Sequence, residues 1–259
     1  MTASTPARAA RETSGAWYAA EEGAGRAAAD ARGSGEHIPL GELPKFDSDA
    51  RVALYRAMCD EDWAKAHDLL ITAKDTPIDY VNDKHNTVLH AAVQFSAPLA
   101  FTARLLERGA DPNAENVYGA TPLHFAAAFR APYATFEALL NRGADPNRLD
   151  QYGVTPLHVA VEKGSPLRVI ELLLRKGGDP NVANNAGFTA MHVAAEHDPP
   201  VPVVRALLSS GADINRKTKK GSTPLDIALG HHGSSAQLVG FLRDEGGFRA
   251  KDLGCCAVS

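Results

Sequence analysis

The sequence predicts an all-α repeat solenoid of stacked helix pairs joined by β-hairpin turns. The first observation behind this prediction is a period, because His90, His124, His158 and His192 follow one another at intervals of 34 residues. The second observation is that three other residue types keep the same interval: Gly109, Gly143, Gly177 and Gly211; Pro98, Pro132, Pro166 and Pro200; Thr87, Thr121, Thr155, Thr189 and Thr223. Each unit is too small to bury its own apolar face, so its stability must come from its neighbours.

The chain divides into three parts. Residues 1–47 are rich in Ala, Gly, Arg and Ser with little periodicity, and we predict that they form a disordered N-terminal segment. The repeat domain covers 48–245 and holds about six units, including an irregular first helix pair, four regular repeats and a divergent last unit: 49–85, 86–118, 119–152, 153–186, 187–220 and 221–245. Asp226 replaces the periodic His in the last unit, which suits a cap. Residues 246–259 are predicted to be a flexible tail.

One repeat shows how each element is justified. Thr121 suits the N-cap of a short first helix, and Pro122 suits its first turn, where a missing N–H costs nothing. Pro132 begins a second helix, which Gly143 ends in a left-handed conformation. In the first cap, the predicted apolar stripe consists of Leu54, Ala57, Trp63, Leu69 and Leu70.

The sequence motifs resemble ankyrin repeats. The motifs are GATPLH (119–124), GVTPLH (153–158), GFTAMH (187–192), and the intervening GADPN, GGDPN and GADIN segments. Tetratricopeptide units share the period, but their Trp, Leu-Gly and Tyr pattern is missing here. Ankyrin-like units usually have 33 residues, and the extra residue lies between the two helices, where Pro recurs. The resemblance covers about residues 49–245.

The resemblance implies a protein partner bound along a concave surface of hairpin tips and first helices. The candidate binding residues are Phe95, Tyr118, Phe125, Phe129, Tyr152, Phe188, Lys219 and Lys220. For Phe125 and Phe129, packing against adjacent helices stays open as the alternative. The run of Arg216, Lys217, Lys219 and Lys220 is either a solvated hairpin tip or a contact for an acidic partner or anionic lipid.

The ten histidines and three cysteines do not suggest catalysis. The resemblance implies that the periodic histidines bond backbone near the turns, and a spacing of about 10 Å would be too wide for a shared metal. The sequence lacks the common nucleotide-binding and hydrolase motifs, so we predict a non-enzyme without metal or cofactor. His231-His232 is a weak metal-like pair, and an active site near Cys59, Trp63 and His67 is the remaining enzymatic alternative.

The resemblance also implies one modification. Asn113, Asn147, Asn181 and Asn215 each follow a Leu by eight positions, and such Asn residues can be substrates of an asparaginyl hydroxylase. The alternative is that each Asn holds its turn.

Composition limits location and partners. The net charge of −4 argues against nucleic acid, and no uncharged run is long enough to span a bilayer. An odd cysteine count suggests a reducing compartment, so we expect a cytoplasmic monomer.

The last four residues, Cys256-Ala257-Val258-Ser259, have the pattern of a farnesylation site. Cys255 could carry a palmitate as the second anchor that one isoprenoid needs, although both cysteines could instead be free thiols. The sequence thus favours an interaction scaffold, or adaptor, tethered to the cytosolic face of a membrane. The alternative is a soluble inhibitor or sequestering factor without a lipid anchor.

Overall fold

The computed structural model describes residues 50–72, 84–230, 235–249 and 252. These residues form helices and hairpin loops, and none of them is in a strand, so the predicted hairpins form without a β-ladder. The predicted disordered segment 1–47 lies outside the described residues. The chain divides into two compact units, one ending at Asp145 and one beginning at Pro146.

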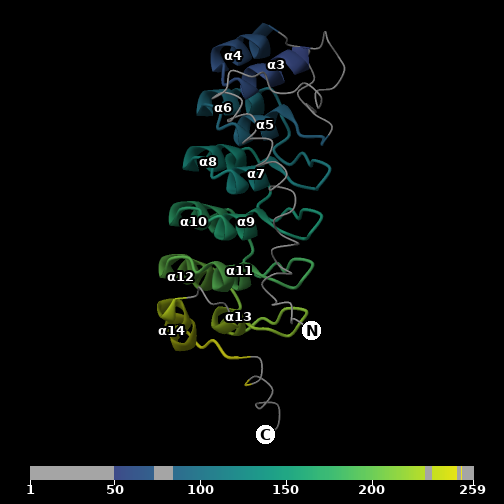
Figure 1. The fold of residues 1–259 in the computed structure, drawn as a ribbon. Coiled ribbons are helices and arrows are strands. Elements are labelled where there is room, and N and C mark those ends of the chain that lie inside the picture. The colour runs from purple at the N-terminus through teal and green to yellow at the C-terminus, as the bar shows by residue number, and fades with distance from the viewer. Residues whose placement is uncertain (1–49, 73–83, 231–234, 250–251, 253–259) are drawn as a thin grey trace, which may run out of the picture. The chain divides into compact units, whose positions relative to one another are not determined.

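The N-terminal unit contains three helix pairs in its described part. They are α3 (Ala50–Cys59) with α4 (Trp63–Thr72), α5 (Val88–Gln94) with α6 (Leu99–Glu107), and α7 (Pro122–Ala128) with α8 (Tyr133–Asn141). Helix α5 packs against both α3 and α7, and α6 packs against α8, so the helix pairs are stacked in chain order (Figure 1). Each first helix therefore contacts the first helix of the next pair.

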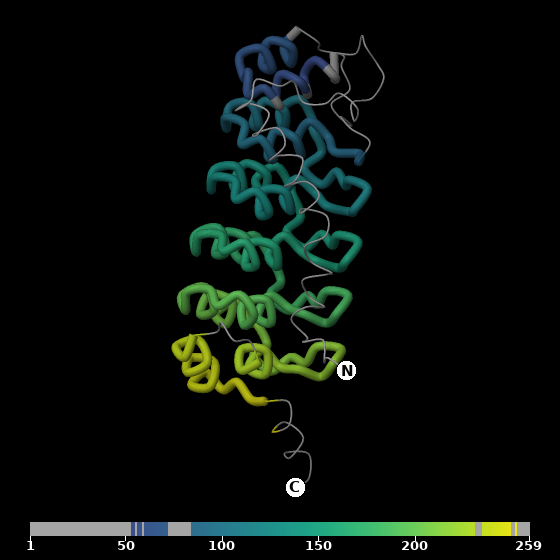
Figure 2. The backbone as a smooth tube through the Cα atoms, in the orientation of Figure 1, coloured from purple at the N-terminus to yellow at the C-terminus, as the bar shows by residue number. Residues whose placement is uncertain are grey.

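The C-terminal unit repeats this arrangement. Its described helix pairs are α9 (Pro156–Glu162) with α10 (Leu167–Arg175), α11 (Ala190–His197) with α12 (Val201–Ser209), and α13 (Pro224–Gly230) with α14 (Ala236–Asp244). Helix α11 packs between α9 and α13, and α12 packs between α10 and α14. Within the unit the loops leave the helix pairs on the same side (Figure 2). The predicted repeat solenoid is confirmed.

The core uses one residue type at each repeating position. Ala92, Ala126, Ala160 and Ala194 are fully buried on the first helices, where a small side chain lets neighbouring helices approach closely. The second helices contribute Leu105, Leu139, Leu173 and Leu207, which are also fully buried. Burying each Leu contributes about 2 kcal/mol to stability. The 34-residue period is therefore the period of the core.

The helix ends follow the predicted chemistry. Pro122, Pro156 and Pro224 occupy the first position of their helices, and Pro98, Pro132, Pro166 and Pro200 are the N-caps of the second helices. The loop before each of these N-caps contains one residue with positive φ: Ser96, Arg130, Gly164 and Asp198. Three of these four are not glycine, so the loops carry some backbone strain.

The first helix pair is a cap of a different kind. Leu54, Ala57 and Leu70 are buried as predicted, whereas Trp63 and Leu69 are only half-buried. The Trp63 ring packs 5.6 Å from the Phe101 ring of the next pair. Among the described helices none combines the length and the apolar character needed to cross a membrane.

Candidate functional site

The periodic histidines join each repeat to the following one. The backbone N–H of Thr87 donates to Nδ1 of His90 over 3.0 Å, so Nδ1 carries no proton and the hydrogen must be on Nε2. Nε2 then donates to the Ala120 carbonyl, 3.0 Å away and 30 residues further along the chain. His158 and His192 make the same two bonds, the second to the Phe188 and Ser222 carbonyls. These side chains therefore bond backbone, as the resemblance implied.

Burial keeps these imidazoles neutral. Desolvation lowers the pKa of His90, His158 and His192 from 6.5 to about 4, because a buried ring loses the water that would stabilise its charge. A proton on Nδ1 would also face the threonine N–H. Within the described residues no group of three His, Cys, Asp or Glu side chains could hold a metal. The pair His231-His232 lies outside the described residues.

A second hydrogen-bond ladder follows the repeated asparagines. Asn113 Nδ2 donates to the Gly143 carbonyl over 2.8 Å, and its Oδ1 accepts the Asp145 N–H over 2.7 Å. Asn147 and Asn181 make the equivalent bonds one repeat further on. Each of these Asn side chains thus has a structural role, but it holds the corresponding turn of the following repeat and not only its own, while hydroxylation of these residues stays a prediction.

The hairpins are fixed by a third set of residues, which the sequence reasoning missed. Each is a buried polar side chain at the base of a hairpin, and its oxygen accepts N–H groups of the turn: Asn116, Asp150, Asn184 and Thr218. The signal was available, because these four residues keep the 34-residue interval and precede the Gly of the turn by three positions. Neighbouring tips are also joined by backbone bonds, such as Asn185 N–H to the Tyr152 carbonyl over 2.9 Å.

The family follows from one comparison. A family model described as ankyrin repeats (3 copies) matches residues 54–150, 96–184, 131–218 and 157–247, which together cover most of the chain. The chain belongs to the ankyrin-repeat family. No curated protein matches it. Ankyrin-repeat proteins are generally non-catalytic interaction modules, so the family match indicates a protein–protein interaction domain.

Two predicted binding residues of this ankyrin-repeat protein are not on its surface. Phe125 is fully buried, with its ring 4.9 Å from His90 and 5.6 Å from Phe129, and Phe188 is 5% exposed beside His192. The prediction of exposed side chains is therefore wrong for Phe125 and Phe188. Phe125 occupies an inward-facing position of the repeat, since the matching residues Ala91, Val159 and Val193 are also buried and apolar. The positions that match Phe188 are mixed, with Ala120 and Val154 apolar but Asn86 and Ser222 polar.

The other predicted aromatics reach solvent in part. Phe95 and Phe129 are half-buried at the ends of the first helices α5 and α7, and Tyr118 and Tyr152 are half-buried on hairpins. Val117, a variable hairpin position in the sequence, is 48% exposed, and the structure adds Leu149, which is also 48% exposed on a hairpin. Whether any of these residues binds a partner stays a prediction.

The enzymatic alternative gains no support from the first helix pair. Trp63 packs on Phe101, and His67 is exposed on α4. The side chain of Cys59 lies outside the described residues.

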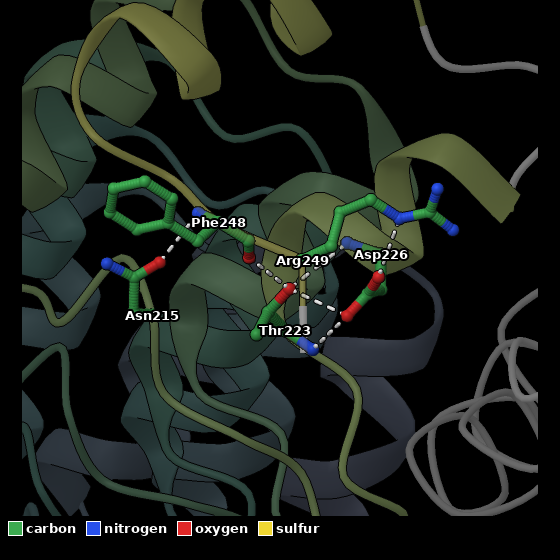
Figure 3. Close-up of polar contacts among 5 residues, drawn as sticks. All are labelled: Asn215, Thr223, Asp226, Phe248 and Arg249. Carbon is green, nitrogen blue, oxygen red and sulfur yellow. Dashed lines mark hydrogen bonds and ion pairs between the residues drawn. The ribbon is translucent and has the colours of Figure 1, made fainter. Parts of the chain in front are cut away.

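In the last repeat, a cluster of polar contacts takes the place of the contacts that a following repeat would make. Asp226 Oδ2 accepts the Thr223 N–H over 3.1 Å, and its Oδ1 lies 3.3 Å from Arg249 Nε (Figure 3). Asn215 bonds the Gly246 carbonyl and the Phe248 N–H, which are the two bonds that Asn113 makes to the following repeat. The predicted tail boundary is therefore corrected: residues 246–249 are part of the last repeat. The remaining tail, apart from residue 252, lies outside the described residues.

The hairpin before this cluster carries the predicted basic run. Arg216, Lys217, Lys219 and Lys220 are all exposed on residues 213–222, which we call the basic hairpin. The Lys219 backbone N–H bonds the Ala186 carbonyl over 3.2 Å, which fixes the tip against the preceding hairpin. The structure therefore leaves Lys219 and Lys220 available for contact, as their predicted role requires.

Proposed function

We propose that this ankyrin-repeat protein is a scaffold or adaptor that binds a protein partner through its hairpin tips and first-helix ends. Prenylation of Cys256, with palmitate on Cys255 as a second anchor, would tether it to the cytosolic face of a membrane. Tethering would raise the local concentration of the partner. The protein–protein interaction domain itself follows from the family match.

One observation carries the partner-binding proposal: exposed apolar side chains stand on hairpins whose backbones are held by hydrogen bonds. Val117 is 48% exposed next to Tyr118, while Asn116 Oδ1 accepts the N–H groups of Tyr118 and Ala120. The Val117 N–H also bonds the Lys84 carbonyl over 2.9 Å. A surface fixed in this way loses little conformational entropy on binding, so its aromatic contacts contribute fully to affinity.

Affinity capture with matched variants tests this surface. The double variant Val117→Asp/Tyr118→Ala changes the hairpin, and Leu99→Asp is the control, because Leu99 is 45% exposed on the second helix α6 of the same unit. We expect wild type and Leu99→Asp to recover the same partner, and the double variant to lose it by tenfold or more, as about 2 kcal/mol for an anchor predicts. Circular dichroism checks that all three proteins fold. Equal recovery by all three would contradict the placement of the surface.

Metabolic labelling with an isoprenoid analogue tests the tether. Wild type should take up the label and sediment with membranes, whereas Cys256→Ser should take up no label and sediment with membranes to a smaller extent. If wild type takes no label and both forms fractionate alike, the tether is excluded and a soluble inhibitor or sequestering factor becomes the better description.

A further inference from the structure

The basic hairpin differs in charge from the other hairpins. Hairpins 111–120, 145–154 and 179–188 carry net charges of −2, −1 and −1, whereas residues 213–222 carry one acidic and four basic residues. In the described part of the chain, none of the four basic side chains forms an ion pair. Among these four hairpins, only residues 213–222 carry a net positive charge, although the whole chain has a net charge of −4.

An apolar side chain stands beside this charge. Asn215, which directly precedes Arg216, accepts the Phe248 N–H over 2.8 Å, so Phe248 is held next to the basic hairpin (Figure 3). Its ring is 52% exposed, the highest value among the exposed large apolar side chains of the described residues. The Phe248 carbonyl lies 2.8 Å from Thr223 Oγ1, which fixes this segment from a second side.

The position of Cys256 relates this surface to the proposed lipid. Cys256 follows Arg249 by seven residues, which span at most about 25 Å when fully extended. A lipid on Cys256 would therefore enter a bilayer close to the docked segment. One isoprenoid chain gives only marginal binding, so a second contact with the membrane is required.

We propose that the basic hairpin and Phe248 together form such a contact, in addition to the proposed palmitate on Cys255, as a docking surface for anionic lipid headgroups. The inference rests on the proposed tether, which brings the last repeat to the bilayer. The lysines would attract the headgroups, and the Phe248 ring would enter the interface. Asp226 does not oppose the attraction, since it pairs with Arg249, and residues 213–249 keep six basic against four acidic side chains. Phe248 is exposed on a segment whose backbone bonds Asn215 of the basic hairpin, and this segment lies within reach of the proposed lipid on Cys256; both features favour a membrane over an acidic protein.

Vesicle sedimentation of the unlipidated full chain tests this proposal. Wild type should bind vesicles that contain phosphatidylserine better than vesicles of phosphatidylcholine alone, and added salt should weaken the binding. Lys219→Gln/Lys220→Gln should lower the partition coefficient roughly 25-fold, because each basic side chain contributes about fivefold at an anionic surface. Lys65→Gln/Arg142→Gln is the control, since it removes the same charge from exposed positions of the N-terminal unit. Phe248→Ala should lower binding several-fold on both kinds of vesicle.

Three results would overturn the proposal. The first is equal partitioning of wild type and Lys219→Gln/Lys220→Gln. The second is an equal loss in the control, which would show that overall charge matters and not the hairpin. The third is no binding of wild type to anionic vesicles while the hairpin variant loses a protein partner, which would assign the hairpin to an acidic protein. A failed tether is recognised separately by Cys256→Ser and leaves this vesicle result unchanged, because the protein tested carries no lipid.

Discussion

The repeat at 187–220 and the last repeat have different residues at one position, His192 and Asp226. In the first, Nδ1 of His192 accepts the Thr189 N–H and its Nε2 donates to the next repeat at the Ser222 carbonyl. In the last, Asp226 also accepts a threonine N–H, but its second oxygen contacts Arg249. Starting the helix therefore needs only an acceptor, whereas joining a further repeat needs a side chain that also donates. The end of the stack keeps the first function and gives up the second.

The largest expected effect is on the pH dependence of stability, to which the repeats with a buried histidine contribute and the last repeat does not. His90, His158 and His192 have pKa values lowered to about 4 from 6.5, so the unfolded state takes up protons before the folded state does. Their contribution to stability is complete above pH 6.5, decreases as the pH falls towards 4, and is lost below that. Each histidine should add about 1.4 kcal/mol per pH unit to the slope.

Urea unfolding across this pH range measures the effect. His158→Gln should reduce the proton uptake on unfolding by about one, whereas Asp226→Ala should leave the uptake by the three histidines unchanged. A stability that does not vary with pH between 4 and 6.5 would contradict the buried neutral imidazoles.

Two glycines give an intermediate effect. Gly187 and Gly221 have the same conformation, with φ of +84° and +83°. A Cβ at Gly187 would lie 2.5 Å from the Lys219 backbone N, while a Cβ at Gly221 would meet nothing within 4 Å. Gly221→Ala should therefore cost only the left-handed strain of about 1 kcal/mol, and Gly187→Ala should cost at least about 1 kcal/mol more. Equal free energies of unfolding for the two variants would show that the following hairpin does not cover Gly187.

The smallest effect concerns the ion pair of the last repeat. The side chains of Asp226 and Arg249 are 20% and 46% exposed, so Arg249→Ala should destabilise the protein by less than about 1 kcal/mol, and high salt should remove the difference. Asp226→Ala should cost about 1 kcal/mol in high salt as well, because it also removes the acceptor for the Thr223 N–H. Thermal unfolding of the two variants at low and high salt measures the difference. If salt changed the stability of both variants equally, Asp226 would contribute only through its ion pair, which would contradict this prediction.

The sequence predicts the interior of the stack well because contacts there repeat. Thr155, Pro156 and His158 form a helix start, and His158 also bonds the next repeat, so a local motif carries long-range information. Burial could also have been predicted, since Phe125 has only apolar residues at its matching positions in the other repeats. The same comparison would not have predicted the burial of Phe188, because its matching positions include the polar residues Asn86 and Ser222.

The end of the stack is harder to predict, since Gly246 follows Gly211 by 35 residues and so departs from the 34-residue interval. Gly246 and Phe248 bond Asn215 through their backbone atoms. The contact therefore cannot be predicted from the side chains of residues 246–249. Similarly, the left-handed φ of 53° at Arg130 follows from the loop between two packed helices and not from the residue itself. Both features depend on tertiary contacts that outweigh local preference.

A carboxylate at position 226 has a consequence for the length of the array. An additional repeat would present a backbone carbonyl at this place, and the carboxylate would offer it a second acceptor where a donor is required. Asp226 thus disfavours the addition of a further repeat at this end. Adding a repeat by design would require histidine at position 226 and the removal of residues 246–249. Asp226 and these four residues together therefore form the C-terminal cap of the stack.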